Sequence, residues 1–231
     1  MATIRTNCRE RFSADDLEFI AASIAGNAGV GDLLQDADAL DAALESDRLL
    51  KSVLELPGNV PLTPHFYFYV LTRHMLSRFD RSVADYVASV LASFVGRDGA
   101  TRRPQSEHEL GDLAESAVPY ISDMLVALQS ASSEKEFLIR VQVGNYSLFL
   151  SGIFPQHIAH RSTYHASPPI SFYEEVGSQN YRLASGHRLA HASALEETYR
   201  TIADRFSEVR QGLNQMSDRL LCFEPIGGLP E

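Results

Sequence analysis

Apolar residues recur at helical spacing along most of this 231-residue chain. Steps of three and four residues predict amphipathic helices, because they place apolar side chains on one face of a helix. Ser13 precedes two acidic residues and an apolar run, so it is expected to cap a helix over 14–25. Thr63 followed by Pro64 predicts the start of a second helix, which is apolar on nearly all sides.

Two central stretches differ in how clearly they indicate a helix. Residues 81–95 carry their large apolar residues on a single stripe, which predicts a helix. Residues 133–154 include FLIRVQV, a run rich in β-branched residues that also favours a strand. We predict a helix there, because the apolar pattern continues past this run and the sequence offers no partner strand.

The clearest pattern lies near the C-terminus, where apolar residues alternate in steps of four and three over more than three heptads. They are Leu195, Tyr199, Ile202, Phe206, Val209, Leu213, Met216 and Leu220. This pattern predicts one long helix with an apolar seam. Ala203 and Gly212 flank the seam and allow close helix approach, which favours the core of a bundle. The alternative is a homodimer, in which the chain self-associates through the Leu195–Leu220 seam.

Together these patterns predict an all-α fold. We expect a compact multi-helix bundle of about eight to ten helices that ends in the long heptad-patterned helix. The alternation of strands and helices typical of a doubly wound sheet is missing from the sequence. Residues 1–231 are expected to form a single helical domain, or two packed halves divided at the polar connection 96–110.

The charge of the chain bears on its partners. Apolar residues make up 45% and charged residues 22%, which is typical of a globular protein. The net charge of −10 repels nucleic acid and anionic membranes on average, so either partner would need a local basic patch. The one dense basic cluster in the sequence consists of Arg97, Arg102 and Arg103. The longest apolar runs are shorter than the roughly 20 residues that cross a bilayer. We therefore expect no nucleic-acid partner and no membrane partner.

Cysteine usage bears on the cellular location. Cys8 and Cys222 lie near opposite ends of the chain and form no CxxC pair, so a disulfide framework is not expected. The first residues lack the apolar core of a secretory signal. Both observations predict a cytoplasmic protein. Each cysteine is interpreted as a small apolar residue rather than a nucleophile.

Four histidines form two pairs at helical spacing, and they are the candidate metal ligands. They are His157 and His160, three residues apart, and His187 and His191, four residues apart. On a helix each pair would share one face, as two imidazoles must to hold one ion. Two features count against a metal site. No Glu stands three residues before any of these histidines, as di-iron proteins require, and Arg161 and Arg188 place a cation beside each pair.

Polar residues also interrupt two otherwise apolar predicted helices. Arg140, Asn145 and Tyr146 lie in one, and Arg73 and His74 lie in the other. A buried arginine or asparagine must be paired, so these residues either join helices together or line a pocket for a small ligand. Both interpretations are open, and the five residues are the candidate ligand-binding set.

The chain contains no GxSxG, Walker or HExxH signature. The missing motifs and the heptad seam together favour a non-enzymatic binding protein. Its target would be a protein partner, a second copy of the chain or a small ligand held between helices. The alternative is a metal-dependent enzyme that uses the histidine pairs and a neighbouring glutamate. The sequence identifies no cofactor and does not decide whether the protein is an enzyme.

Overall fold

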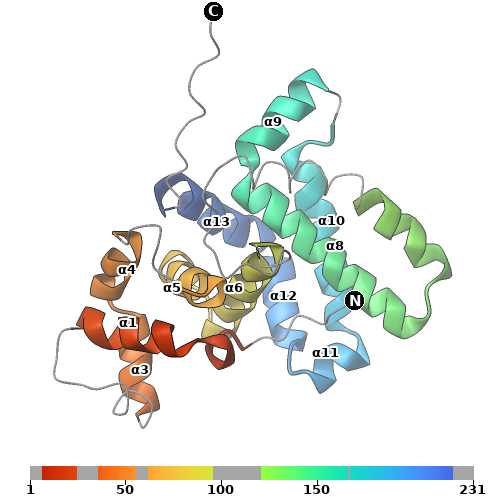
Figure 1. Ribbon diagram of the computed structural model, residues 1–231. Coiled ribbons are helices and arrows are strands. Elements are labelled where there is room, and N and C mark those ends of the chain that lie inside the picture. The colour runs from red at the N-terminus through yellow and green to blue at the C-terminus, as the bar shows by residue number, and fades with distance from the viewer. Residues whose placement is uncertain (1–6, 25–35, 56–61, 96–120, 166, 221–231) are drawn as a thin grey trace, which may run out of the picture. The chain divides into compact units, whose positions relative to one another are not determined.

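The computed structural model describes residues 7–24, 36–55, 62–95, 121–165 and 167–220. Within these ranges every regular element is a helix, which confirms the all-α prediction (Figure 1). The chain divides into two compact units, one formed by Ile4–Gln105 and the other by Met1–Thr3 with Ser106–Glu231. The boundary falls in the polar connection 96–110, which itself lies outside the described residues together with its arginines. The total number of helices stays a prediction.

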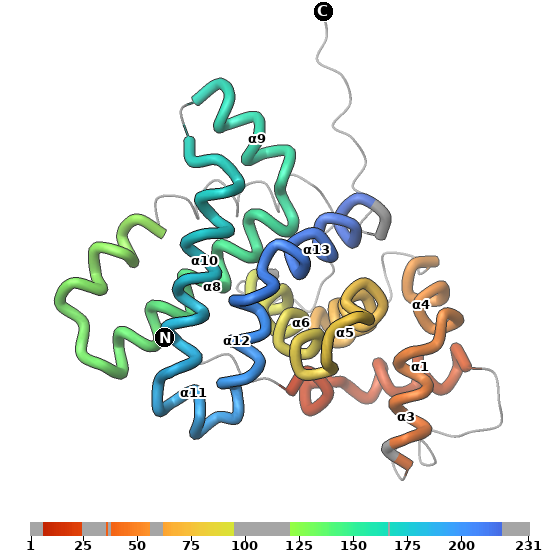
Figure 2. Tube along the Cα trace, turned by 180° about the vertical axis from the view of Figure 1, so that it is seen from behind, coloured from red at the N-terminus to blue at the C-terminus, as the bar shows by residue number. Residues whose placement is uncertain are grey.

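The N-terminal unit is built around two adjacent helices. Its elements are η1 (Arg9–Arg11), α1 (Ala14–Ile24), α3 (Ala37–Leu44), α4 (Asp47–Leu54), α5 (Pro64–Met75) and α6 (Arg81–Val95). Helices α5 and α6 pack side by side, and α4 contacts both α5 and α1 (Figures 1 and 2). The predicted stripe of α6 is buried, and α5 is buried on nearly all sides. Both findings follow from the apolar pattern of these helices.

One buried carboxylate joins the starts of α1 and α5. Asp16 accepts a hydrogen bond from the Ser13 N–H (2.8 Å), while the Ser13 hydroxyl accepts from the Asp16 N–H (3.1 Å). This reciprocal pair is a capping box. The same carboxylate accepts from the Thr63 N–H (2.9 Å) and the Thr63 hydroxyl (2.7 Å). Thr63 in turn caps α5 by accepting from the Phe66 N–H (3.2 Å). The caps predicted at Ser13 and Thr63 are therefore confirmed.

The C-terminal unit is arranged around its longest helix. Its elements are a helix over 121–127, η3 (Leu128–Ser130), α8 (Ser133–Ile153), α9 (Pro155–Tyr164), α10 (Ile170–Ser185), α11 (Arg188–Ala192), α12 (Glu196–Asp204) and α13 (Phe206–Leu220). Helix α8 contains FLIRVQV, so the helix predicted for this run is confirmed. Helices α10 and α13 both pack on α8 (Figures 1 and 2).

Glycines allow the helices of this unit to approach closely. A Cβ atom at Gly144 of α8 would lie 2.9 Å from Cζ of Tyr181 on α10. A Cβ at Gly177 of α10 would lie 2.5 Å from Cζ of Phe206 on α13 and 2.8 Å from Cβ of Ser147 on α8. No side chain larger than hydrogen fits at either crossing without movement of its neighbours.

Polar side chains of α13 cover the C-terminal end of α8. The last carbonyls of a helix have no partner within the helix and need one elsewhere. The Asn214 amide donates to the carbonyls of Ser151 (2.9 Å) and Gly152 (2.6 Å), and the Ser217 hydroxyl donates to the carbonyl of Ile153 (3.1 Å). The end of α8 is thus held by a helix far away in the sequence.

The heptad-patterned segment forms two helices, so the prediction of one long helix for it is wrong. Helix α12 ends at Asp204 and α13 begins at Phe206, with Arg205 between them at φ −120° and ψ 31°. Because α12 packs on α10 whereas α13 packs mainly on α8, the chain turns where the seam changes its partner. The seam residues from Leu195 to Met216 are all buried, while the side chain of Leu220 lies outside the described part. This burial favours the bundle-core interpretation of the seam.

Within the described residues, no single helix is long and apolar enough to cross a bilayer. Helices α8 and α9 meet the length and composition criteria only as a pair bent by 91°.

Candidate functional site

The histidines of the C-terminal unit have distinct surroundings. His187 caps α11, because its Nδ1 accepts from the Leu189 N–H (3.1 Å), while its Nε2 lies 2.9 Å from the Ser133 hydroxyl. Both nitrogens of this ring therefore take part in the fold. Nδ1 of His191 lies 3.2 Å from the Glu196 carboxylate at the surface. Among the residues that the structure describes, no three His, Cys, Asp or Glu side chains are grouped closely enough to hold a metal ion.

The other histidine pair lies on α9, which begins at Pro155. His160 is exposed, and its ring centroid lies 4.8 Å from that of Tyr164 and 5.9 Å from that of His165. His157 is half-buried and lines a pocket. The two histidines therefore have different surroundings on the same helix.

Three of the candidate ligand-binding residues lie on α8 and contribute to its packing. The Asn145 carbonyl oxygen accepts from the Tyr181 hydroxyl (2.7 Å), and both side chains are buried. Arg140 donates to the Asn180 carbonyl oxygen (3.3 Å), which also joins α8 to α10. Tyr146 is buried in the same helix. These contacts are those expected if the polar residues join helices together.

The remaining two candidates lie on α5 in the N-terminal unit. Arg73 forms an ion pair with Glu45, which caps the end of α3. His74 donates from Nδ1 to the Val70 carbonyl (2.8 Å), and its Nε2 lies 3.9 Å from the Asp47 carboxylate. The contacts with Glu45 and Asp47 join α5 to the end of α3 and the start of α4, whereas the bond to Val70 lies within α5. None of the five candidates lines the pocket that contains His157.

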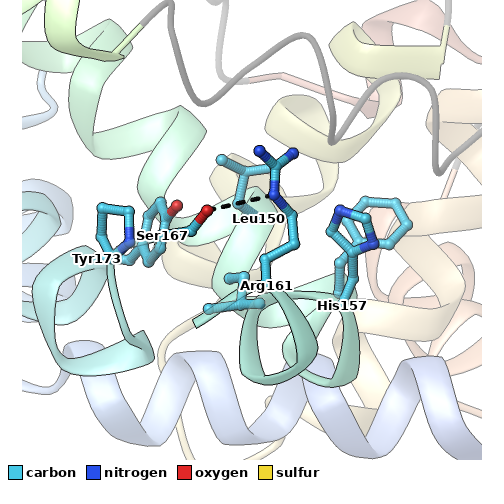
Figure 3. A pocket seen from close by; sticks show the side chains of 8 residues that line it. Leu150, His157, Arg161, Ser167 and Tyr173 are labelled. Carbon is cyan, nitrogen blue, oxygen red and sulfur yellow. Dashed lines mark hydrogen bonds between the residues drawn. The ribbon is translucent and has the colours of Figure 1, made fainter. Parts of the chain in front are cut away.

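That pocket lies between the end of α8, helix α9 and the start of α10 (Figure 3). Its lining residues are Leu150, Phe154, His157, Ile158, Arg161, Ser167, Pro168 and Tyr173. Its enclosed space is about 10 Å³, room for about one water molecule. The side chains of Arg161, Ser167 and Tyr173 lie together on one side, and His157 lies on the other side of Arg161 (Figure 3).

Local sequence features explain how this pocket forms. Phe154 ends α8 with φ −121° and ψ 47°, and Pro155 starts α9 in a new direction because proline cannot continue α8. The resulting bend between the two helices is 91°. At the other end of α9, the backbone N–H groups of His165 (2.9 Å) and Ser167 (3.3 Å) both donate to the Arg161 carbonyl. This turn places Ser167 beside the Arg161 side chain.

The polar groups of the pocket are hydrogen-bond donors at neutral pH. Nε of Arg161 donates to the Ser167 hydroxyl (3.4 Å). Tyr173 is 1% exposed, and burial raises the pKa of its phenol although the positive charge of Arg161 opposes this effect. The phenol therefore stays protonated at neutral pH. Such a set, with apolar walls around it, is suited to binding a small polar group rather than to nucleophilic chemistry.

Cys8 in the N-terminal unit is not arranged as a nucleophile. Its sulfur is fully buried and lies 3.1 Å from the Ser89 hydroxyl. Burial raises the pKa of this thiol to about 12, so the reactive thiolate does not form at neutral pH. The interpretation of Cys8 as a small apolar residue is confirmed, whereas Cys222 lies outside the described residues.

Asp85 lies next to Cys8, and its carboxyl group leads us to predict that the free energy of unfolding depends on pH. Its carboxylate accepts from the Cys8 N–H (3.1 Å), and burial raises its pKa to about 6. Between about pH 4 and 6 the folded chain keeps a proton that the unfolded chain releases, so the free energy of unfolding falls as the pH rises. Asp85→Asn keeps an acceptor for Cys8 without a charge. We expect it to stabilise the protein at pH 7 by about 1–2 kcal/mol, a value reduced for partial exposure.

Urea denaturation at pH 4 and pH 7 tests this prediction. The gain from Asp85→Asn should shrink at pH 4, where the native carboxyl is protonated. Asp123→Asn, which changes an exposed carboxylate of the other unit, should have little effect at either pH. An Asp85→Asn protein that is less stable than the parent at pH 7 would contradict the argument.

Sequence reasoning did not select Arg161, Ser167 and Tyr173 as ligand-binding residues. It treated Arg161 as a cation that disfavours a metal ion. One signal was present: the chain has a net charge of −10, yet it contains no Asp or Glu between Glu136 and Glu174, the segment that forms the pocket. No known protein family, curated protein or solved structure matches this chain.

Proposed function

We propose that this protein is a non-enzymatic binding protein that holds a small ligand between helices, in the pocket formed by α8, α9 and α10. The observation that carries the proposal is the combination of apolar walls with convergent donors. Leu150, Phe154 and Ile158 supply the walls, and Arg161 and Tyr173 supply donors. Ligand sites commonly combine a mostly apolar lining with a few polar groups that orient the ligand.

The size of the pocket limits the ligand. Sites for drug-sized molecules have volumes of about 300–1,000 Å³, whereas the enclosed space of this pocket is about 10 Å³, so a ligand larger than a water molecule enters only when the lining side chains move apart. The ligand is therefore a molecule with few heavy atoms. The lining helices meet through the bend at Phe154 and the turn at Ser167, which bring the lining residues together.

A screen of small fragments against the full chain tests this proposal, with ligand-observed NMR as the readout. Ser167→Phe places a ring in the pocket, and Thr163→Phe adds the same ring at an exposed position on α9. We expect fragments that compete with one another, that bind the parent and Thr163→Phe equally, and that do not bind Ser167→Phe. The proposal is wrong if no fragment binds or if Ser167→Phe leaves binding unchanged.

Two alternatives have direct tests of their own. Self-association through the Leu195–Leu220 seam predicts a dimer in sedimentation, although the burial of this seam within the chain supports a core role. A metal-dependent enzyme predicts stoichiometric zinc, iron or manganese in untagged protein that is purified without chelator. The cytoplasmic location that we propose rests on the sequence, whose cysteines are not arranged as a disulfide framework.

A further inference from the structure

We propose that Arg9, Arg73 and Arg81 form a docking site for an acidic helical segment of a protein partner, and that α3 fills this three-arginine site in the free chain as an internal competitor. The arginines come from η1, α5 and α6, and α3 with its C-terminal cap supplies the carboxylates that they bind. This inference concerns the N-terminal unit and does not depend on the pocket of the C-terminal unit.

Two carboxylates of α3, one helical turn apart, share the three arginines. Asp41 forms ion pairs with Arg9 and Arg81. Glu45, which caps the end of α3, forms ion pairs with Arg73 and Arg81, the second at 3.0 Å. The hydrogen bond from Arg73 holds the pKa of Glu45 below its ordinary value. Because residues four apart lie on the same face of a helix, one face of α3 matches the three guanidinium groups.

The three-arginine site keeps part of its structure without α3. Arg9 donates to the Tyr69 hydroxyl from Nε (3.1 Å) and Nη2 (2.9 Å), and its guanidinium carbon lies 5.5 Å from the centre of the Tyr69 ring. Arg73 extends from α5, a helix that is buried on nearly all sides, and its own side chain is 10% exposed. A half-buried cation that loses its carboxylate is costly, so the site favours a replacement anion.

Helix α3 is short, and much of its attachment depends on charge. Its eight residues are fewer than the roughly 12–15 that an isolated helix needs in water, so its helical form depends on docking. Among its described side chains, the buried apolar ones are Ala43 and Leu44 at its C-terminal end. The side chains of Arg81 and Glu45 are 53% and 41% exposed, so water and salt weaken their ion pair. We therefore expect α3 to detach while α5 and α6 stay packed on each other.

The segment that fills the site indicates the chemistry of the partner. Helix α3 presents two carboxylates four residues apart, and guanidinium groups bind carboxylates in a defined planar geometry. A partner helix with the same spacing would satisfy the same donors and could add apolar contacts of its own. Since α3 belongs to the chain, its effective concentration at the site is on the order of millimolar. A partner must bind more tightly than α3 to replace it.

Hydrogen exchange of the full chain tests whether the ion pairs hold α3. Asp41→Asn combined with Glu45→Gln keeps the shape of both side chains and removes their charges. We expect the amides of residues 37–45 to exchange about 10-fold faster in this double variant, with no change in α5 and α6. Asp38→Asn, which changes an exposed carboxylate of α3, should leave exchange as in the parent. Equal exchange in the parent and the double variant would overturn the internal competition.

Peptide binding tests the three-arginine site itself, with fluorescence anisotropy as the readout. The probe is a labelled synthetic peptide with the sequence of residues 36–46. We expect it to bind the double variant about 10-fold more tightly than the parent, whose site is filled by α3. Two altered peptides have equal net charge. The peptide with Asn at 36 and 38 should still bind, whereas the peptide with Asn at 41 and Gln at 45 should not.

Arginine substitutions in the double variant assign the binding to the site. Arg81→Gln should weaken peptide binding about 10-fold, and because its side chain is 53% exposed the change disturbs little packing. Arg78→Gln, which removes an exposed arginine outside the three-arginine site, should have no effect. Equal binding of both altered peptides, equal effects of the two substitutions, or no binding to the double variant would overturn the docking site. Each of these results leaves the proposed function of the other unit unchanged.

Discussion

Asp16→Ala is expected to lower the free energy of unfolding by about 3–5 kcal/mol, a large part of the stability of a typical domain. The carboxylate is fully buried and accepts bonds from the Ser13 N–H and from both the N–H and the hydroxyl of Thr63. Its removal leaves these three donors without an acceptor and frees the starts of α1 and α5 together. Bonds to a buried charged group contribute more than neutral ones, which explains the size of the effect.

Chemical denaturation of the full chain measures this loss. Asp15→Ala is the matched control, because it removes the neighbouring carboxylate of the same first turn, which is exposed. We expect the control to change stability by less than about 0.5 kcal/mol. A loss below about 1 kcal/mol for Asp16→Ala would show that water replaces the carboxylate.

Gly177→Ala is expected to destabilise the protein by about 2 kcal/mol, although alanine is the better helix former by about 1 kcal/mol. The new methyl group would lie 2.5 Å and 2.6 Å from two ring atoms of Phe206 and 2.8 Å from Cβ of Ser147. Contacts this short require α10 to move away from α8 and α13, which loses packing at both crossings.

Gly186→Ala is the control with the opposite expected sign. Gly186 follows α10 at φ −78°, a conformation open to any residue, and the nearest atom to an added Cβ is the Leu183 carbonyl oxygen at 3.9 Å. Alanine should therefore stabilise the protein by about 0.4–1 kcal/mol, because it restricts the unfolded chain. Thermal unfolding compares the two variants. Equal effects would contradict the packing argument at Gly177.

Local signals were predictable from the sequence because they depend on neighbouring residues. Ser13 and the Thr63–Pro64 pair specify helix starts within a few positions, and the pattern of 81–95 specifies one buried face. Contacts between distant residues were not predictable in the same way. The bonds from Thr63 to Asp16 span 47 residues, and no periodic pattern records them. The heptad seam likewise did not reveal that its two halves pack mainly on different helices.

The candidate site shows the same limit. The spacing of His157 and His160 marked α9 as a candidate site. The spacing of residues along one helix does not show which residues of other helices lie opposite it. The pocket depends on the 91° bend before α9 and on the turn that brings Ser167 back to Arg161. Tyr173 then enters from α10. The bend, the turn and the approach of α10 each depend on the direction that the backbone takes in space. The pattern of apolar residues along the sequence does not predict that direction.

The contacts of Asn214 and Ser217 with the end of α8 set an order of events during protein synthesis. The carbonyl of Ser151 obtains its partner only after the ribosome has added Asn214, 63 residues later. At about 5–20 residues per second this delay is about 3–13 s. During that time Leu150, which lines the pocket, belongs to a helix whose end is not yet held. A nascent chain arrested before α13 would therefore lack these bonds.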